Sequence, residues 1–201
     1  MKQEPGLQEA KSQRAREAIS EATIDSLVQV GYSETSLSRV AKLAGFSKGA
    51  VQHHFTSKED LIAATLDRLL ERTFQPRAPS SRARTVEDAL MTAWMRFINT
   101  PPYRALMEIL IAARTDAQLR TRISKDLVRW GRRMDRQSLE NYEAVSGDPE
   151  DVVMLLNMNR SFLRGLLLQE QYGISKKKTL LYVQKWIELI APLLRLKNPG
   201  K

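Results

Sequence analysis

The amino-acid sequence predicts an all-α protein, and three observations support that fold class. Apolar residues recur at spacings of three and four along nearly the whole chain, which is the period of an amphipathic helix. No segment alternates apolar and polar residues over a useful length, as a half-buried strand would. Glycines, prolines and capping Ser or Thr residues interrupt the periodic segments at intervals. These features divide the 201 residues into about nine predicted helices.

The first two helices are predicted at 9–30 and 37–44. Gly31 ends the first of them, because glycine readily adopts the left-handed conformation that closes many helices. Ser36 precedes the second helix and is expected to cap its first free amides. The residues of the second helix that should face the core are Val40, Ala41 and Leu43.

Two further helices are predicted at 48–54 and 58–74. Ser47 caps the shorter one. Ser57 caps the longer one, and Asp60 three positions later completes a pattern close to a capping box. The short helices and the tight turn between them predict a compact helix-turn-helix unit.

The segment 75–84 is rich in Pro, Ser and Arg and is the best linker candidate in the chain. We therefore expect a three-helix domain over 1–57, a connecting fourth helix over 58–74, and a larger helical domain over 75–201. The helices predicted in the larger domain are 86–98, 103–114, 118–142, 150–172 and 175–194.

The last two predicted helices are apolar around more than one face. Such a helix must bury more than one side. A partner subunit could cover the second side, and a fully internal position is the alternative. The residues expected at a homodimer interface are Phe162, Leu163, Leu166, Trp186, Leu189 and Ile190.

The net charge of +9 is distributed unevenly. Residues 1–60 carry eight Lys/Arg and eight Asp/Glu, whereas residues 61–140 carry fifteen and nine. The interval 36–58 contains no acidic residue at all. Its basic residues are Arg39, Lys42, Lys48 and Lys58. A compact helical pair without negative charge suits a surface that lies against DNA phosphates.

The composition argues against several other classes of protein. The absence of cysteine excludes disulfides and thiolate metal sites. The two histidines, His53 and His54, point about 100° apart on a helix, so they cannot form an i,i+4 chelating pair. The chain has no Gly-rich phosphate loop, nucleophile elbow, signal peptide or membrane-length apolar run. We therefore expect a cytoplasmic protein with no metal, no cofactor and no enzymatic site.

A helix over 48–54 that enters the major groove would read base edges with its N-terminal residues. Gly49 and Ala50 keep the leading edge of that helix slim. The side chains that can hydrogen-bond guanine or adenine there are Lys48, Gln52 and His53. The side chains placed for phosphates are Ser36, Ser38, Arg39, His54 and Lys58. The complete set of expected DNA contacts is Ser36, Ser38, Arg39, Ser47, Lys48, Gly49, Ala50, Gln52, His53, His54 and Lys58.

A family resemblance lies in the motifs of residues 14–62. These motifs are Gly31-Tyr32, Thr35-Ser36, Val40-Ala41, Ala44-Gly45, Ser47-Lys48-Gly49, His54-Phe55 and Ser57-Lys58-Glu59-Asp60-Leu61. Together they resemble the N-terminal domain of the tetracycline-repressor (TetR) family of bacterial regulators. Gln52 departs from that pattern, because the family usually has a tyrosine there that contacts phosphate.

The resemblance implies a homodimer that binds a pseudo-palindromic operator in double-stranded DNA. It also implies an unidentified small-molecule effector, bound in the larger domain, that releases a repressor from its operator. The residues that could line its pocket, or equally pack in the core, are Met91, Trp94, Met95, Leu110, Leu127, Trp130, Met134, Met154, Asn157 and Met158. Other polar groups that would need partners there are Asn159, Arg160 and Arg164. The alternative function is a helical protein-interaction module that does not bind DNA.

Overall fold

The computed structural model describes residues 6–74 and 83–197, so most of the predicted linker lies outside the described residues. Within these ranges the chain forms nine α-helices and one small two-stranded sheet, which confirms the all-α fold class. The helices gather into two compact units. The first unit comprises residues 6–74 and 101–126, and the second comprises residues 83–100 and 127–197.

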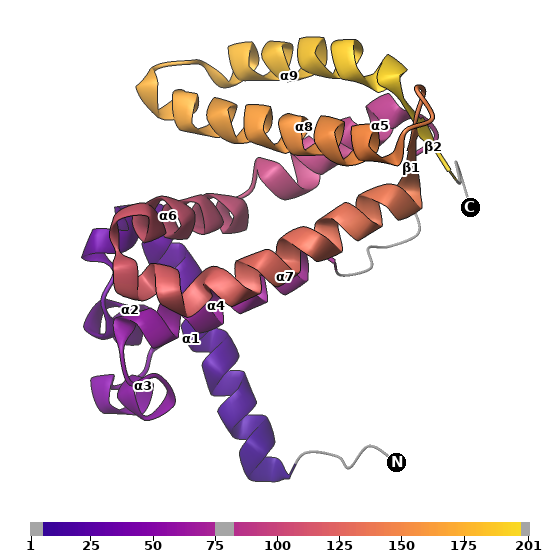
Figure 1. Ribbon diagram of the computed structural model, residues 1–201. Helices are drawn as coiled ribbons and strands as arrows, with labels where there is room; N and C mark the ends of the chain where they lie inside the picture. The colour runs from indigo at the N-terminus through magenta and orange to yellow at the C-terminus, as the bar shows by residue number, and fades with distance from the viewer. Residues whose placement is uncertain (1–5, 75–82, 198–201) are drawn as a thin grey trace. The chain divides into compact units, whose positions relative to one another are not determined.

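The first unit contains the helix-turn-helix and the helices packed behind it. Its helices are α1 (Leu7–Glu34), α2 (Leu37–Ala44), α3 (Lys48–His54), α4 (Lys58–Arg72), α6 (Pro101–Thr115) and the beginning of α7 (Ala117–Asn141). The long helix α1 contacts α2, α4 and α6, as Figure 1 shows. The helix α7 continues past residue 126 into the second unit without a break.

The predicted caps of α2, α3 and α4 are all formed. Ser36, Ser47 and Ser57 accept hydrogen bonds from backbone amides three residues later, at 3.2, 3.1 and 3.0 Å. Each cap satisfies one of the amides that the first turn of a helix leaves without a partner. The boundaries predicted for α2 and α3 are therefore confirmed residue for residue.

α1 changes direction at Gly31, where the predicted helix was expected to end. The φ of 74° and ψ of −179° at Gly31 belong to a region that essentially glycine alone adopts. The chain then completes a final turn to Glu34. Gly45 does adopt the left-handed helical conformation, with φ 73° and ψ 24°, and closes α2.

The core of the helix-turn-helix joins α1 to the three helices that follow it. Its buried residues are Ile19, Ala22, Val40, Ala41, Val51, Phe55 and Leu61. Leu43 was expected to join them, and that expectation is wrong because its side chain is 44% exposed. The eight-residue helix α2 turns one narrow stripe inward, and Leu43 lies outside that stripe.

The second unit is a helical layer closed by a short sheet. Its elements are α5 (Val86–Ala93), a π-helical turn (Trp94–Ile98), the remainder of α7, β1 (Tyr142–Ala144), α8 (Pro149–Gln169), α9 (Lys176–Ile190) and β2 (Leu194–Leu196). Helices α8 and α9 run side by side in opposite directions (Figure 1). The strands pair antiparallel, with Tyr142 opposite Leu196. The sequence predicted helix at residue 142 and at residue 194, and both predictions are wrong. None of the helices in the described ranges is long and apolar enough to cross a bilayer.

Candidate nucleic-acid interface

α3 has one buried side and one exposed side. Val51 is fully buried in the helix-turn-helix core, and Phe55 directly follows the helix as a second buried anchor. Lys48, Gln52 and His53 are exposed on the other side. The packing therefore presents to solvent the three side chains that the sequence placed against base edges.

Gly49 contributes nothing to the packing of the free chain. A Cβ atom built on it meets no other atom within 4 Å. Its backbone also lacks the positive φ that would require glycine. Folding therefore does not require a glycine at this position, and its small size is available for binding.

The exposed face beside α3 is basic. Arg39, Lys42 and Lys48 are all exposed, and no carboxylate occurs between residues 36 and 58. Ser36 and Ser38 are exposed at the start of α2 on the same helical pair. This arrangement concentrates positive charge although residues 1–60 carry no net charge.

The end of α3 is held by a residue that the sequence analysis missed. Arg16 of α1 donates a hydrogen bond from Nη1 to the backbone oxygen of His54 at 3.2 Å. Its guanidinium lies 4.7 Å from the centre of the Phe55 ring. Burial lowers the pKa of His54, and the charges of His53 and Arg16 lower it further. No signal in the sequence joins Arg16 to residues so far along the chain.

Lys58 is engaged with the protein's own backbone. Its Nζ donates to the carbonyl oxygens of Tyr32 at 2.6 Å and Ser33 at 3.2 Å. The same ammonium lies 4.1 Å from the centre of the Tyr32 ring. Burial lowers the pKa of Lys58, while nearby carboxylates act in the opposite direction.

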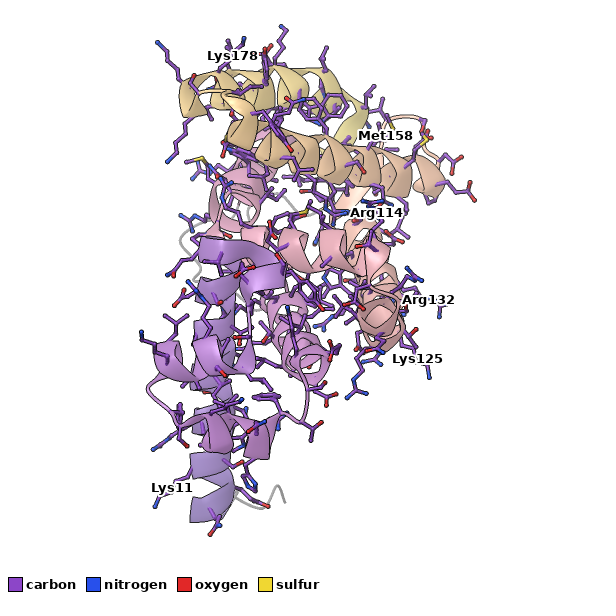
Figure 2. All side chains as sticks on the ribbon, turned by 90° about the vertical axis from the view of Figure 1, so that its left-hand side faces the viewer. Lys11, Arg114, Lys125, Arg132, Met158 and Lys178 are labelled. Carbon is purple, nitrogen blue, oxygen red and sulfur yellow. The ribbon has the colours of Figure 1, made fainter. Side chains whose placement is uncertain are left out.

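The residues named for an effector pocket are spread over different environments. Trp94 is buried, whereas Met95, Met154 and Met158 are exposed, and Met158 projects from α8 in Figure 2. Leu110 belongs to the first unit and the other nine residues belong to the second. The half-buried members are Met91, Leu110, Leu127, Trp130 and Met134.

The polar groups on α8 have neighbouring side chains as partners. The Asn159 Oδ1 accepts a hydrogen bond from the Trp186 indole at 3.0 Å. Arg160 donates to Asn157 at 2.7 Å, and its guanidinium lies 3.4 Å from the Asp135 carboxylate. Among the described residues, no three His, Asp or Glu side chains come together as a metal site would require.

The residues named for a dimer interface separate into two groups. Leu163, Leu166 and Ile190 are buried inside the second unit. Phe162 and Trp186 stack with ring centres 4.5 Å apart. These two rings line an open, mostly apolar groove of about 470 Å³ between α8 and α9. Its other lining residues are Ser161, Gly165, Leu166, Gln169, Tyr182, Lys185 and Leu189.

The chain is similar to known regulators of transcription. A family model described as "Bacterial regulatory proteins, tetR family" matches residues 19–65. An HTH-type transcriptional regulator of Mycobacterium tuberculosis is 28% identical over 172 residues, which cover 79% of this chain and 88% of that protein.

Solved structures share the fold at lower identity. A putative TetR-family transcriptional regulator from a Rhodococcus species has a TM-score of 0.62 at 20% identity, covering 89% of this chain and 99% of that one. NalD, the secondary repressor of a multidrug efflux pump in Pseudomonas aeruginosa, has a TM-score of 0.60 at 17% identity. The alignment with NalD covers 92% of this chain and 98% of that one.

Proposed function

We propose that this chain, which belongs to the tetracycline-repressor (TetR) family of bacterial regulatory proteins, is a sequence-specific DNA-binding transcriptional regulator. The observation that carries this proposal is the exposed side of α2 and α3. That side combines an acid-free interval, two Ser-capped helix starts and three outward side chains on α3. Val51 and Phe55 anchor the opposite side, so α3 can lie in a major groove about 12 Å wide as a firmly held helix.

The contacts divide into base readers and phosphate binders. Lys48 and Gln52 would read guanine and adenine, because their donors and acceptors match those edges. Gly49 and Ala50 would let the backbone of α3 come close to the bases. The side chains proposed to fix register on phosphates are Ser36, Ser38, Arg39, His54 and Lys58.

The second unit would supply the dimer contact. The groove between α8 and α9 is lined by the exposed Leu189 and the half-buried Trp186, and its walls are mostly apolar. A second copy of the chain, placed on a two-fold axis, would bury the same groove on both subunits. Such a dimer would set two α3 helices about 34–36 Å apart, or somewhat more, on a pseudo-palindromic operator.

We keep the functional division expected from the sequence, with a reader in 1–57, a connecting helix in 58–74 and a regulatory and dimerisation domain in 75–201. A small molecule bound in the regulatory domain would favour a dimer whose α3 spacing no longer fits the operator. The chain would then act as a repressor that its effector releases. We propose no enzymatic role, and we place the protein in the cytoplasm.

The test is DNA binding by the full-length protein at two salt concentrations. Fragments of the host genome that the protein captures would be sequenced, and the affinity for the captured site would be compared with that for random DNA. We expect a preference of at least about 10³-fold for the captured site. Binding to both should weaken steeply with salt, because phosphate contacts release counterions.

A helical protein-interaction module would give a different result. It would bind random and captured DNA equally weakly, and neither binding would depend steeply on salt. If the protein binds its operator and no small molecule alters that binding, the proposed release by an effector is refuted. The proposed DNA binding through α2 and α3 is then unaffected.

A further inference from the structure

The turn between α6 and α7 belongs to the first unit, with the helix-turn-helix. Asp116 lies at this turn, and its two carboxylate oxygens bond different helices. Oδ1 accepts a hydrogen bond from the backbone amide of Leu119 at 2.9 Å, which caps α7. Oδ2 accepts one from the hydroxyl of Tyr32 at 2.8 Å, just beyond the kink of α1. Asp116 therefore ties the start of α7 to the end of α1.

Asp60 makes a second tie between α7 and the helix-turn-helix. Its Oδ1 accepts a hydrogen bond from Arg122 Nη2 of α7 at 2.7 Å. Its Oδ2 accepts one from the hydroxyl of Thr56, which lies in the short link between α3 and α4. One carboxylate thus connects α7 to the segment that follows the proposed DNA-reading helix.

Lys58, in the first turn of α4, contacts Tyr32 at the end of α1. Its contacts with the carbonyl and the ring of Tyr32 bring α4 against the end of α1. Burial raises the pKa of Tyr32, and the Asp116 carboxylate raises it further, so the phenol keeps its proton at neutral pH. We call the residues that meet here the corner cluster, which consists of Tyr32, Lys58, Asp60, Asp116 and Arg122.

The corner cluster lies at one end of a helix that serves both units. α7 runs uninterrupted from Ala117 to Asn141, and its residues from 127 onward belong to the second unit. Long helices bend only gently, unless a proline, a bulge or an inserted group kinks them. A change in direction of the far part of α7 therefore displaces its first turns, where the corner cluster holds α1 and α4.

We propose that the corner cluster is the coupling element of this regulator, which sets the position of α3 according to the state of the second unit. This inference rests on the proposed function, because it explains how the reader responds to that state. The five side chains are positioning residues that act on α3 through α1, α4 and the link at Thr56. The Asp60–Arg122 pair is partly exposed, and a pair of that kind shifts an equilibrium by about fivefold at most. An effect of that size is enough to favour one of two positions of α3 over the other.

Coupling is reciprocal, so operator DNA itself serves as the probe. Hydrogen exchange of residues 127–141 would be measured in the full-length protein with and without the captured genomic site. In the unaltered protein we expect operator binding to change exchange in this segment by about fivefold or more. The segment belongs to the second unit and contains none of the residues proposed to contact DNA.

The decisive variant combines Tyr32→Phe with Arg122→Ala. It should bind the operator within about tenfold of the unaltered protein, because two exposed or half-exposed contacts are lost, and it should lose most of the exchange response. Arg120→Ala is the matched control on the same helix. It removes the same charge, but Arg120 bonds the α6 carbonyls of Ala113 and Arg114, at 3.4 and 3.2 Å. The control should keep the response.

Three results would overturn the proposal. The double variant could keep the full exchange response, or the unaltered protein could bind its operator without any response in 127–141. A double variant that melts like the unaltered protein and yet binds no operator would make the cluster part of the DNA surface itself. If the double variant does not fold, Tyr32→Phe alone decides the matter, since it keeps the ring beneath Lys58 and should still weaken the response. An unaltered protein that binds no DNA would contradict the proposed function, which is a separate observation.

Discussion

At the scale of single residues, Gly49 separates the requirements of folding from those of binding. The space around it would accept a methyl group in the free chain, and its backbone is helical. Gly49→Ala should therefore leave the protein as stable as before, or stabilise it by up to about 1 kcal/mol. Operator affinity should nevertheless fall at least about tenfold, because the added methyl stands where α3 would approach the bases. Thermal unfolding checks the predicted stability, and operator titration of the same preparation checks the predicted loss of affinity. A Gly49→Ala variant that keeps full operator affinity would contradict the proposal that α3 lies in the major groove.

Lys48 and Lys58 should respond differently to the same truncation. Lys48 is exposed at the first turn of α3, so Lys48→Ala should relax the preference at one base position by about 1–3 kcal/mol. Lys58→Ala should weaken binding to all sequences alike. If Lys58 contacts phosphate, the salt dependence should also fall by about one unit. If it acts by holding Tyr32, that dependence should stay unchanged. Titration of operator and single-base variants at several salt concentrations distinguishes these cases, and equal profiles for both lysines would refute the division of roles.

His54 predicts the direction of a pH effect on DNA binding. In the free chain, burial and the neighbouring charges of His53 and Arg16 lower the pKa of His54 below 6.5, so the ring is neutral at pH 7. A phosphate beside the ring would raise that pKa, because it stabilises the charged form. Binding would then take up a proton, and operator affinity should rise as the pH falls through the interval between the two pKa values. His54→Gln should flatten this rise, as measured by titration between about pH 7.5 and 5.5, and an unchanged pH profile would exclude the phosphate contact.

At the scale of elements, the kink of α1 depends on Gly31. Its φ of 74° and ψ of −179° lie where other residues are strained by about 1–3 kcal/mol. A Cβ on Gly31 would also come within 3.1 Å of the Glu108 carboxylate of α6. Gly31→Ala should destabilise the protein by that amount. Gly131→Ala in the interior of α7 is the control, since its Cβ meets nothing within 4 Å and it should stabilise by up to about 1 kcal/mol. Chemical denaturation of both variants tests the contrast, and similar shifts in the two would contradict it.

Capping chemistry explains why the short helices were predictable. Ser36, Ser47 and Ser57 each act on an amide only three residues away, so the signal and its structural effect are adjacent in sequence. The strands β1 and β2, by contrast, pair residues near 143 with residues near 195. Three-residue strands carry too little alternation to be recognised, and their pairing depends on how α7 and α9 end. The prediction that Leu43 is buried was wrong for a related reason. The helices that pack against a short helix determine which of its stripes is buried.

The candidate site was predictable to the same extent. The exposed residues of α3 follow from the helix period once Val51 and Phe55 are assigned to the core. The contacts of Arg16 with His54, of Tyr32 with Asp116 and of Asp60 with Arg122 join residues far apart in the chain. Charged and polar residues of these types occur on every solvated helix, so nothing in the sequence distinguishes the ones that meet. Such contacts appear only when the packing of the helices is known.

At the scale of the whole molecule, the proposed activity requires two readers joined at a fixed spacing. A single seven-residue helix reads too few base pairs to select one site in a genome, whereas two linked readers multiply their discrimination. The groove between α8 and α9 is the surface proposed for that link. Its stacked rings are held in place from within the unit, because Asn159 accepts the indole hydrogen bond of Trp186.

Leu189 and Leu181 provide a matched test of the proposed dimer. Both lie on α9 and are 60% exposed, but Leu189 lines the groove and Leu181 is not among its lining residues. Leu189→Glu would place a charge in an apolar contact between subunits, where burying it without a partner costs several kcal/mol. The variant should therefore sediment as a monomer at concentrations where the unaltered protein is a dimer. Its operator affinity should fall by about 10²-fold or more, because the second reader is no longer tethered.

Leu181→Glu places the same charge on the same helix at equal exposure and should change neither property. Unfolding temperatures should stay close for both variants at concentrations low enough to dissociate the dimer, because neither residue belongs to the buried core. If Leu181→Glu dissociates the protein and Leu189→Glu does not, the subunits meet on a different face of α9. If neither variant does, α8 and α9 are not the interface. The spacing of the two α3 helices would then be set by a contact between subunits on another surface.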